Sequence, residues 1–448
     1  MIREKVIIKR IQSYDVQAIQ NFTAEAIKKL GIKSKPRAFI KPNLVMATRY
    51  AEHAYTHTDV LKGVFRALDN HGIIQKTLFE DCGLFVPLRY AYRASGYNKL
   101  CKQENVDFLN LSEAIFDSFL KVDKASVHGR LPIPSTLTQD ALRVFVPKLK
   151  VHSQTDITGA VKLNIGIIKR SIRLHRHHHD LGKKIADSLA AFPPDLVITD
   201  AINVGINGVG CPDAVNLGVM IASRNAVASD AVGAWLFGYN PEEIEHLTLA
   251  SHRGLGPVKL SEVEIINPDN IQPVSSEVFR EKEISKIHTN FSYFEGRVHE
   301  GKRCKGGCIG FIGESLHYLN RYNKWRRGEN LNFFANALFG LIGQLPSQER
   351  QRKAGIVVGD YKGEIPEDLR SNLIFVGDCT KAGNYKPRVH LKGCPVYMAR
   401  MVFRFAMDAR AMNPFIDVVE GLPFIRAFIE EKVMKLYNIV THHLRRKR

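Results

Sequence analysis

Apolar positions in residues 1–265 alternate between two spacings. Short β-branched runs are typical of strands, among them KVIIKRI, RAFIKPNLV and DLVITDAINV, and the stretches between such runs carry apolar residues at helical spacing. Residues 15–31 and 58–72 are two of these stretches, and each ends in a glycine, as helices commonly do. Strands alternating with helices of this length predict an α/β domain with a layered, mostly parallel sheet. Ligands of such sheets bind at the carboxyl ends of the strands.

The alternation stops at residues 266–300, which we interpret as a connector after the first domain, residues 1–265. A second, smaller α/β unit is expected over residues 301–448, where GIVVGDYK and LIFVGDCT have the pattern of two similar strand ends. This unit ends in a predicted helix, PFIRAFIEEKVMKLYNIV, and the basic tail THHLRRKR. A chain of 448 residues is long enough for two or three domains.

The chain is strongly basic, with 64 Lys and Arg against 45 Asp and Glu and a formal net charge of +19. This charge attracts polyanions, which include nucleic acid, anionic membranes and phosphorylated or carboxylated small molecules. The most apolar long stretch, FFANALFGLIGQL, is shorter than the roughly 20 residues that span a bilayer, so we expect no transmembrane segment. Charged residues interrupt the apolar run of the N-terminus, which is unlike a secretory signal, and we expect a cytoplasmic protein.

Four of the seven cysteines lie in the last third of the chain: Cys304, Cys308, Cys379 and Cys394. Four thiolates suit Zn²⁺ or an iron–sulfur cluster, because both are soft and bind sulfur well. Gly306 and Gly307 let the backbone bend between the first two cysteines. The three-residue spacer, however, matches neither the usual zinc pair nor a ferredoxin run. A 4Fe–4S cluster, zinc and four buried cysteines without a metal therefore all stay open.

A second cluster, RLHRHHHD, precedes the predicted helix LGKKIADSLAAF. His175 is spaced three and four residues from His178 and His179, so two of these imidazoles could share one face of a helix and bind a ligand. The alternative is a solvated basic turn without a ligand role.

Lysines and amides follow several predicted strands. The candidates are Lys41 and Asn43 in IKPNLV, Lys148, Lys150 and His152 in PKLKVH, and Lys162 and Asn164 in TGAVKLNIG. Lysines fixed at strand ends form a receptor for carboxylate or phosphate. A histidine that is partly neutral near pH 7 can also move a proton. We therefore assign catalysis to His152, Lys150 and Lys162, and substrate binding to the others.

Asp200 ends the strand DLVITD, and a glycine-rich loop, GINGVG, follows it. Gly208 and Gly210 in this loop would allow close backbone approach to a ligand. The glycine spacing is not the dinucleotide fingerprint, and the sequence holds no Walker A loop. Neither NAD nor ATP binding is predicted.

These stretches, in this order, resemble the family called domain of unknown function 362. The match runs through IKPNLV, PKLKVH, TGAVKLNIG, the histidine before LGKKIADS, DLVITDAI and GINGVG to the segment ASRNAVASDAVGAWLFGYNPEEIEHLTLASHRGLG. It covers residues 35–265 in outline. The resemblance implies an iron–sulfur protein, since many members carry a ferredoxin-type cluster module. It also implies a distant relation to the nickel-dependent lactate racemase group, whose sites use lysines and histidines.

Carried over by motif, the resemblance implies a site of Lys41, Asn43, Lys150, His152, Lys162, Asn164, Asp200 and Asp230. The sequence departs from the family pattern in two ways. It has no run of closely spaced cysteines, so a cluster would depend on the four scattered ones, and it has Cys211 where many members have Gly-Pro.

Three functions follow as hypotheses. The first is a metal-dependent enzyme or redox protein, of oxidoreductase or isomerase type, that holds an iron–sulfur cluster, binds an anionic small molecule and meets an electron-transfer partner. The second is a basic protein that binds nucleic acid or a membrane surface, although the sequence shows no nucleic-acid recognition motif. The third is a zinc-stabilised scaffold without catalysis.

Overall fold

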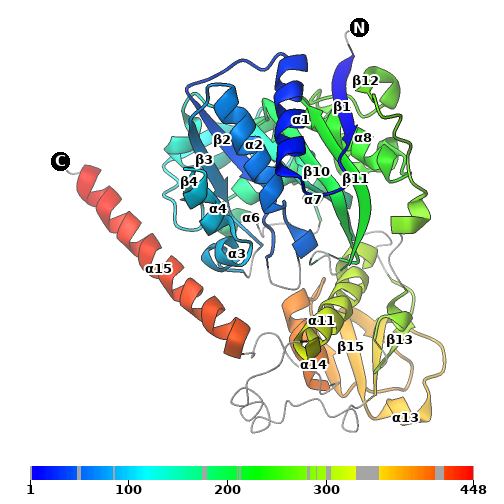
Figure 1. Ribbon diagram of the computed structural model, residues 1–448. Helices are drawn as coiled ribbons and strands as arrows, with labels where there is room; N and C mark the ends of the chain where they lie inside the picture. Colours follow the sequence, from blue (N-terminus) through cyan, green and yellow to red (C-terminus); the bar gives the residue numbers. More distant parts are fainter. Residues whose placement is uncertain are drawn as a thin grey trace. The chain divides into compact units, whose positions relative to one another are not determined.

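The computed structural model describes residues 3–47, 52–83, 86–173, 179–208, 210, 213–279, 283–288, 290–298, 304–328, 353–408 and 418–446. Two compact units make up the chain (Figure 1). Unit 1 comprises Met1–Ile206, Asp213–Arg280 and Phe424–Arg448, and unit 2 comprises Asn207–Pro212 and Glu281–Pro423. The expected division placed all of residues 301–448 in one C-terminal unit, whereas the structure groups residues 424–448 with unit 1.

A ten-stranded sheet forms the centre of unit 1. Its main path runs β12 (Val263–Ile266), β1 (Glu4–Arg10), β11 (Asp213–Ser223), β10 (Leu196–Ile206), β7 (Leu142–Val146), β2 (Arg37–Pro42), β3 (Gln75–Glu80) and β4 (Asp107–Asn110). Neighbours on this path are parallel, except that β11 is antiparallel to both β1 and β10. The predicted mixed α/β fold with a large, mostly parallel sheet is therefore confirmed.

Two short strands extend this sheet next to β10. The strand β8 (Lys148–His152) pairs with β10 in parallel and with β9 (Asp156–Thr158) in antiparallel orientation. Leu149 and Val151 of β8 belong to the main apolar core of unit 1. Because successive side chains of a strand point to opposite faces, Lys148, Lys150 and His152 lie on the other face of β8.

The helices of unit 1 connect its strands. They are α1 (Val16–Lys29), α2 (Thr58–Asn70), α3 (Leu88–Ala94), α4 (Tyr97–Gln103), α5 (Ala160–Leu163), α6 (Arg170–Arg173), α7 (Leu181–Ala191), α8 (Ala226–Leu236) and α9 (Glu245–His252). The long α15 (Val418–Arg446) closes the chain. Leu149 packs against Gly233 of α8, so α8 covers the core-facing side of β8.

Unit 2 holds a four-stranded parallel sheet in the order β13 (Phe291–Glu295), β14 (Ala354–Asp360), β15 (Leu373–Lys381) and β16 (Val389–Leu391). The two similar stretches seen in the sequence, GIVVGDYK and LIFVGDCT, form the neighbouring strands β14 and β15. One core of this unit packs α11 (Gly310–Gly328) and α14 (Met398–Asp408) onto the sheet.

No helix among the described residues is both long and apolar enough to cross a bilayer. The stretch FFANALFGLIGQL, residues 333–345, lies outside the described residues.

The packing of α1 on α2 yields a test of the fold at Gly63. A Cβ at Gly63 would lie 2.7 Å from Cγ2 of Ile19, a fully buried residue of α1, and 3.0 Å from the backbone nitrogen of Gln20. Helix propensity alone predicts that Gly63→Ala stabilises α2 by about 1 kcal/mol. We expect the steric clash to outweigh that gain, because overpacking costs roughly 1–3 kcal/mol, and to lower the free energy of unfolding measured in urea. The control is Gly129→Ala, where a Cβ would meet open space; equal stability changes in the two variants would contradict the packing described here.

Candidate functional site

A buried ion pair links β8 and β10 in the middle of unit 1. The Lys148 ammonium donates to Oδ2 of Asp200 at 2.9 Å and to the hydroxyl oxygen of Tyr14 at 2.7 Å. Both charged side chains are almost completely buried, at 1% and 0% exposure. The register of the two strands places Lys148 directly beside Asp200, so the parallel pairing of β8 with β10 creates the contact. A pair this deeply buried must be kept together, because removing one partner leaves an uncompensated charge in the core.

Two loop residues complete this group. Tyr14 precedes α1, and His57 caps the start of α2 by accepting the backbone N–H of Asp59 on its Nδ1 at 3.2 Å. The rings of Tyr14 and His57 stack with their centroids 3.7 Å apart, and the backbone N–H of His57 donates to Asp200. Burial lowers the pKa of His57 against the opposing effect of the Asp200 carboxylate. A neutral imidazole thus lies beside the Lys148–Asp200 pair.

Lys150 and His152 continue the same face of β8. The Lys150 ammonium, at 1% exposure, donates to the backbone carbonyl of Ala54 at 2.7 Å. His152 is buried, and its Nδ1 accepts the backbone N–H of Gln154 at 3.1 Å. This bond makes Nδ1 an acceptor and leaves Nε2 to carry the proton in the neutral ring. Two lysines and a histidine therefore follow one another along one side of a single strand. The sequence had predicted them after a strand, whereas the structure places them in a strand of their own, β8.

Lys41, at the carboxyl end of β2, belongs to a different group of charges. Its ammonium contacts Oε1 of Glu80 at 2.5 Å, with both side chains buried. Burial lowers the pKa of Lys41 and raises that of Glu80, while the attraction between the two charges opposes both shifts. Gly166 covers the pair closely, since a Cβ there would lie 2.6 Å from the Glu80 carboxylate and 2.8 Å from the Lys41 nitrogen.

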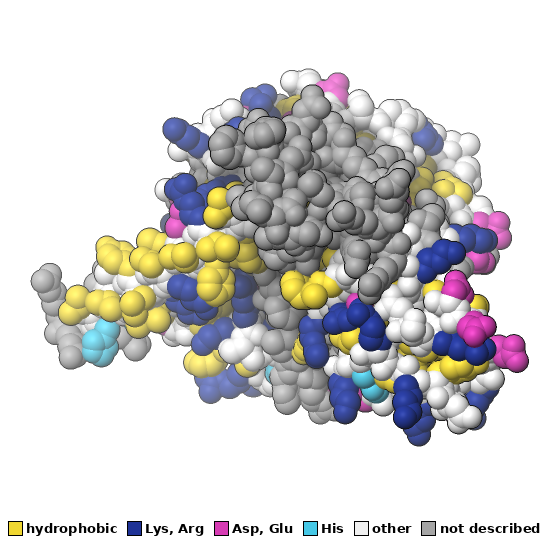
Figure 2. All heavy atoms as spheres, turned by 90° about the horizontal axis from the view of Figure 1, so that it is seen from below, with side chains coloured by type: hydrophobic (Ala, Val, Ile, Leu, Met, Phe, Trp, Pro, Cys, Tyr) yellow, Lys and Arg dark blue, Asp and Glu magenta, His cyan; other side chains and the backbone are white. Residues whose placement is uncertain are grey.

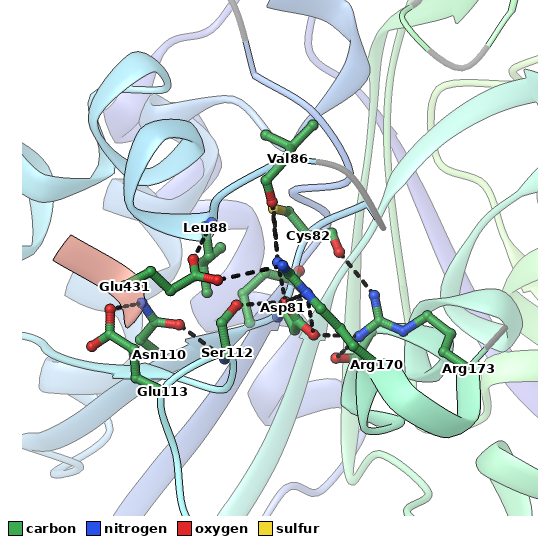
Figure 3. A network of polar contacts seen from close by, with 12 residues as sticks. Asp81, Cys82, Val86, Leu88, Asn110, Ser112, Glu113, Arg170, Arg173 and Glu431 are labelled. Carbon is green, nitrogen blue, oxygen red and sulfur yellow. Dashed lines mark hydrogen bonds and ion pairs between the residues drawn. The ribbon is translucent and has the colours of Figure 1, made fainter. Parts of the chain in front are cut away.

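Next to this pair, Asp81 joins two arginines that follow the predicted Lys162 and Asn164 motif (Figure 3). Arg173 donates to Oδ2 of Asp81 at 2.7 Å and to the backbone carbonyl of Cys82 at 2.8 Å. Arg170 donates to Oδ1 of the same carboxylate at 2.9 Å. The hydroxyl of Ser112 donates to Oδ1 of Asp81 at 2.8 Å as well. The network holds the loop after β3 against α6.

Other predicted site residues have contacts that explain their burial structurally. Both N–H bonds of the Asn164 amide go to backbone carbonyls, those of Ser188 and Phe192. Asp230 accepts the backbone N–H groups of Ala160 and Val161, each at 2.8 Å, at the start of α5. These contacts fix α5 and its surroundings, and a role of either residue in substrate binding stays a prediction.

The remaining predicted residues are placed as follows. Lys162 is half-buried on α5, and Asn43 is buried after β2, where its side chain accepts the N–H of Val45. Gly208 lies in the unit 2 part of the chain with φ +109°, where a Cβ would lie 2.5 Å from Cγ of Glu314 on α11. The absence of a side chain at Gly208 therefore allows α11 to pack closely against the backbone at this position. Gly210 is buried and His179 is exposed, while His175, His178 and Cys211 lie outside the described residues.

The four predicted cysteine ligands all belong to unit 2 and come from three segments. Cys308 lies in the helical turn Lys305–Ile309 that precedes α11 and Cys304 comes directly before this turn, while Cys379 is in β15 and Cys394 follows β16. Cys308 is close enough to Cys379, Cys394 and Cys304 that all three add to the effect of burial in raising its pKa to about 11. None of these cysteines forms a disulfide.

Backbone groups shape the space around Cys308. Its sulfur accepts the backbone N–H of Val396 at 3.4 Å. Gly377 has φ +97°, and a Cβ at this position would lie 3.3 Å from the sulfur of Cys308 and 3.8 Å from that of Cys379. Within the described part of the chain, however, no three His, Cys, Asp or Glu side chains are placed to hold one metal ion, so the structure does not confirm a four-cysteine metal site.

Several residues of the buried charge groups were not predicted from the sequence. They are Tyr14, His57, Glu80, Asp81, Arg170, Arg173 and Glu431. Glu80 ends β3 and Asp81 follows it, just as Lys41 and Asn43 lie at and after the end of β2, and that shared position was the available signal. Tyr14 and His57 precede helices, where a polar side chain commonly serves as a cap, and nothing in their spacing points to the strand they contact.

Fold and site together define a mixed α/β protein in which a large, mostly parallel sheet buries pairs of lysines and carboxylates. Lys41 and Glu80 lie at the carboxyl ends of β2 and β3, whereas Asp200 lies within β10 and does not end a strand, as the sequence had predicted it would. Residues 39–235, somewhat less than half of the chain, match the family described as Domain of unknown function (DUF362). The resemblance seen in the sequence is thereby confirmed.

Solved structures also show similarity to this chain. The lactate racemase apoprotein from Thermoanaerobacterium thermosaccharolyticum is 12% identical, with a TM-score of 0.32 over 55% of this chain and 56% of that one. A protein from Thermotoga maritima is 13% identical, with a TM-score of 0.29 over 47% of this chain and 56% of that one. The chain thus spans somewhat more than half the length of each of these proteins. No curated protein matches the chain.

The buried Asp230 carboxyl predicts a specific pH dependence of stability. Burial raises its pKa from 3.8 to about 7, although the two N–H bonds that it accepts lower it. The native state therefore binds this proton more tightly than the unfolded state does, and the contribution of Asp230 to stability falls as the pH rises towards about 7. We expect the difference in unfolding free energy between wild type and Asp230→Asn to fall by up to about 1.4 kcal/mol per pH unit in that range. Urea titrations across the range measure it.

The matched control is Asp107→Asn, a change of the same kind at an exposed position of β4. A wild-type advantage over Asp230→Asn that stays constant or grows with pH would show that the native carboxyl is already ionised.

Proposed function

We propose that this protein is an iron–sulfur protein whose DUF362 domain binds an anionic small molecule. The observation that carries the proposal is that three cysteines of unit 2, Cys304, Cys379 and Cys394, lie close enough to Cys308 to raise its pKa. Ferredoxin-like proteins hold their clusters by cysteine thiolates and tune them by hydrogen bonds to sulfur. The N–H of Val396, which donates to Cys308, is a bond of that kind.

The residues present fit such a cluster in their chemistry. Four thiols are a soft donor set, and the missing side chain of Gly377 leaves space between two of the sulfurs. Cys304, Cys308, Cys379 and Cys394 would hold the cluster, and a bound 4Fe–4S cluster would supply one-electron redox chemistry. The raised pKa of Cys308 means that its thiol must lose a proton on binding, so cluster assembly would release protons. Zinc in the same thiols, without catalysis, is the competing assignment.

The anion-binding part of the proposal is based on the face of β8. Lys148, Lys150 and His152 share this face, with the neutral His57 nearby and Asp200 as a partner of Lys148. Ammonium groups fixed by backbone and side-chain bonds would meet a carboxylate or phosphate with little loss of side-chain entropy. His152 or His57 would move a proton in such a site, which suits an isomerase or oxidoreductase. The nucleic-acid alternative is supported only by the net charge and the basic tail.

Anaerobic purification tests the cluster. We expect a brown protein with about four iron and four sulfide per chain and thiolate-to-iron absorption. Cys379→Ala should lose most of the iron, whereas Cys101→Ala, which changes a buried cysteine of unit 1, should retain it. Zinc at one per chain would favour the scaffold, and a colourless, metal-free protein would exclude both assignments.

Thermal unfolding with a panel of small carboxylates and phosphates tests the anion site. A ligand at about 100 times its Kd stabilises the protein by about 2.7 kcal/mol, which raises the Tm of a unit of this size by roughly 4 °C. We expect Lys150→Met to remove this increase, because the change keeps the length of the side chain but not its charge. Lys121→Met, at an exposed lysine of the strand β5 (Ser118–Lys121), should leave the increase intact. Retention of the full shift in Lys150→Met would place the anion elsewhere.

A further inference from the structure

The last helix, α15, directs a mixed polar and apolar face inward and a row of apolar side chains outward. Between residues 424 and 438 its buried and half-buried positions are Phe424, Ala427, Glu430, Glu431, Met434 and Asn438, which recur at helical spacing. The side chains at Ile425, Ile429, Val433, Leu436, Val440 and Leu444 are all exposed, and we call this row the apolar stripe. Its spacing of three and four residues keeps all six on one side of the helix. Surface helices normally have the opposite arrangement.

Polar contacts explain why this face of α15 is directed inward. Glu431 is 6% exposed, accepts the backbone N–H of Leu88 at 2.9 Å and pairs with Arg170 at 3.4 Å (Figure 3). Glu430 pairs with Arg93, and the amide of Asn438 donates to the backbone carbonyl of Glu113 at 3.1 Å. The residues that bind α15 to unit 1 therefore lie opposite the apolar stripe, which is left for another partner.

The apolar stripe is long and carries cations along its sides. From Ile425 to Leu444 it extends for about 30 Å, at 1.5 Å per residue. Leu436 and Ile429 are 63% and 56% exposed, and Phe428 and Tyr437 widen the row. Figure 2 shows a row of hydrophobic side chains along this helix with Lys and Arg side chains beside it. Lys432 and Lys435 are exposed, and the sequence continues into RRKR, residues 445–448.

Charge complementarity selects the partner. Both acidic residues in the middle of α15, Glu430 and Glu431, are paired with arginines of unit 1, so the lysines dominate the outer side. A helix with an exposed apolar row and flanking cations matches the in-plane helices that bind anionic bilayers. A second copy of the chain fits less well, because pairing two apolar stripes about their centres would bring Lys432 and Lys435 of the two copies together.

We propose that α15 docks this protein onto the surface of an anionic lipid bilayer, lying in the plane of the membrane with the apolar stripe among the acyl chains. The helix does not need to cross the bilayer, and no described helix meets the requirements for crossing. Its ion pairs with unit 1 would hold the DUF362 domain against the membrane.

Vesicle flotation of the full chain tests the docking. The probes are vesicles of phosphatidylcholine alone and vesicles that also contain phosphatidylglycerol. We expect the wild type to float with the anionic vesicles and to do so less at high salt, since the lysine contribution is screened. Leu436→Glu should reduce the bound-to-free ratio by at least about tenfold, because a charge replaces a side chain that the acyl region would bury. Lys432→Glu combined with Lys435→Glu should reduce binding to the anionic vesicles only.

The control is Ile74→Glu, the same type of change at an isolated apolar side chain that is 67% exposed in unit 1. It should float like the wild type. Circular dichroism and the unfolding midpoint of Leu436→Glu should also match the wild type, because the residue already faces solvent. A wild type that floats with neither vesicle, or a Leu436→Glu variant that floats normally, would overturn the proposal. A wild-type dimer that Leu436→Glu dissociates, without flotation, would assign the stripe to a second copy.

Discussion

The structure of unit 1 depends on the pairing of charges inside a parallel sheet. Lys148 with Asp200 and Lys41 with Glu80 are ion pairs of almost completely buried residues on neighbouring strands. Burial of each charge alone would cost several kcal/mol, so each pair requires its two strands to be in register. Apolar packing of similar volume would stabilise the sheet at least as well. Folding energetics alone therefore do not require charged groups at these positions.

The same requirement connects this site to the end of the chain. Asp81 follows Glu80 in the chain and pairs with both Arg170 and Arg173. Arg170 also pairs with Glu431 on α15. A continuous set of charges thus runs from the strand ends, through α6, to the last helix. Residues in direct contact thus connect the ends of β2 and β3 to α15 within unit 1.

The sequence predicted the fold class and the strand-end lysines because both depend on local patterns. The sequence placed Lys148, Lys150 and His152 directly after a strand, whereas the structure has them within the short strand β8, whose alternation puts them on one face. It could not predict that Asp200 pairs with Lys148, or that Lys41 pairs with Glu80, because these partners are separated by other strands and helices in the chain. The same limit applies to Tyr14 and His57, which reach the site only after two helices pack. The close contact of Gly208, in the glycine-rich loop, with Glu314 could not be predicted either, because the two residues are far apart in the sequence.

The pattern of α15 shows a different limit of sequence interpretation. Its apolar residues have the spacing of a helix that packs onto a core, and that spacing alone favours burial of the row Ile425 to Leu444. The outcome was decided by Glu430, Glu431 and Asn438, since each has a specific partner on unit 1 and none could bond if the helix were rotated by half a turn. Directional polar contacts thus set the orientation of the helix, and the non-directional apolar face was left outward. An amphipathic pattern therefore shows that a helix has two faces. Which of them packs against the rest of unit 1 is decided here by the partners of the polar side chains.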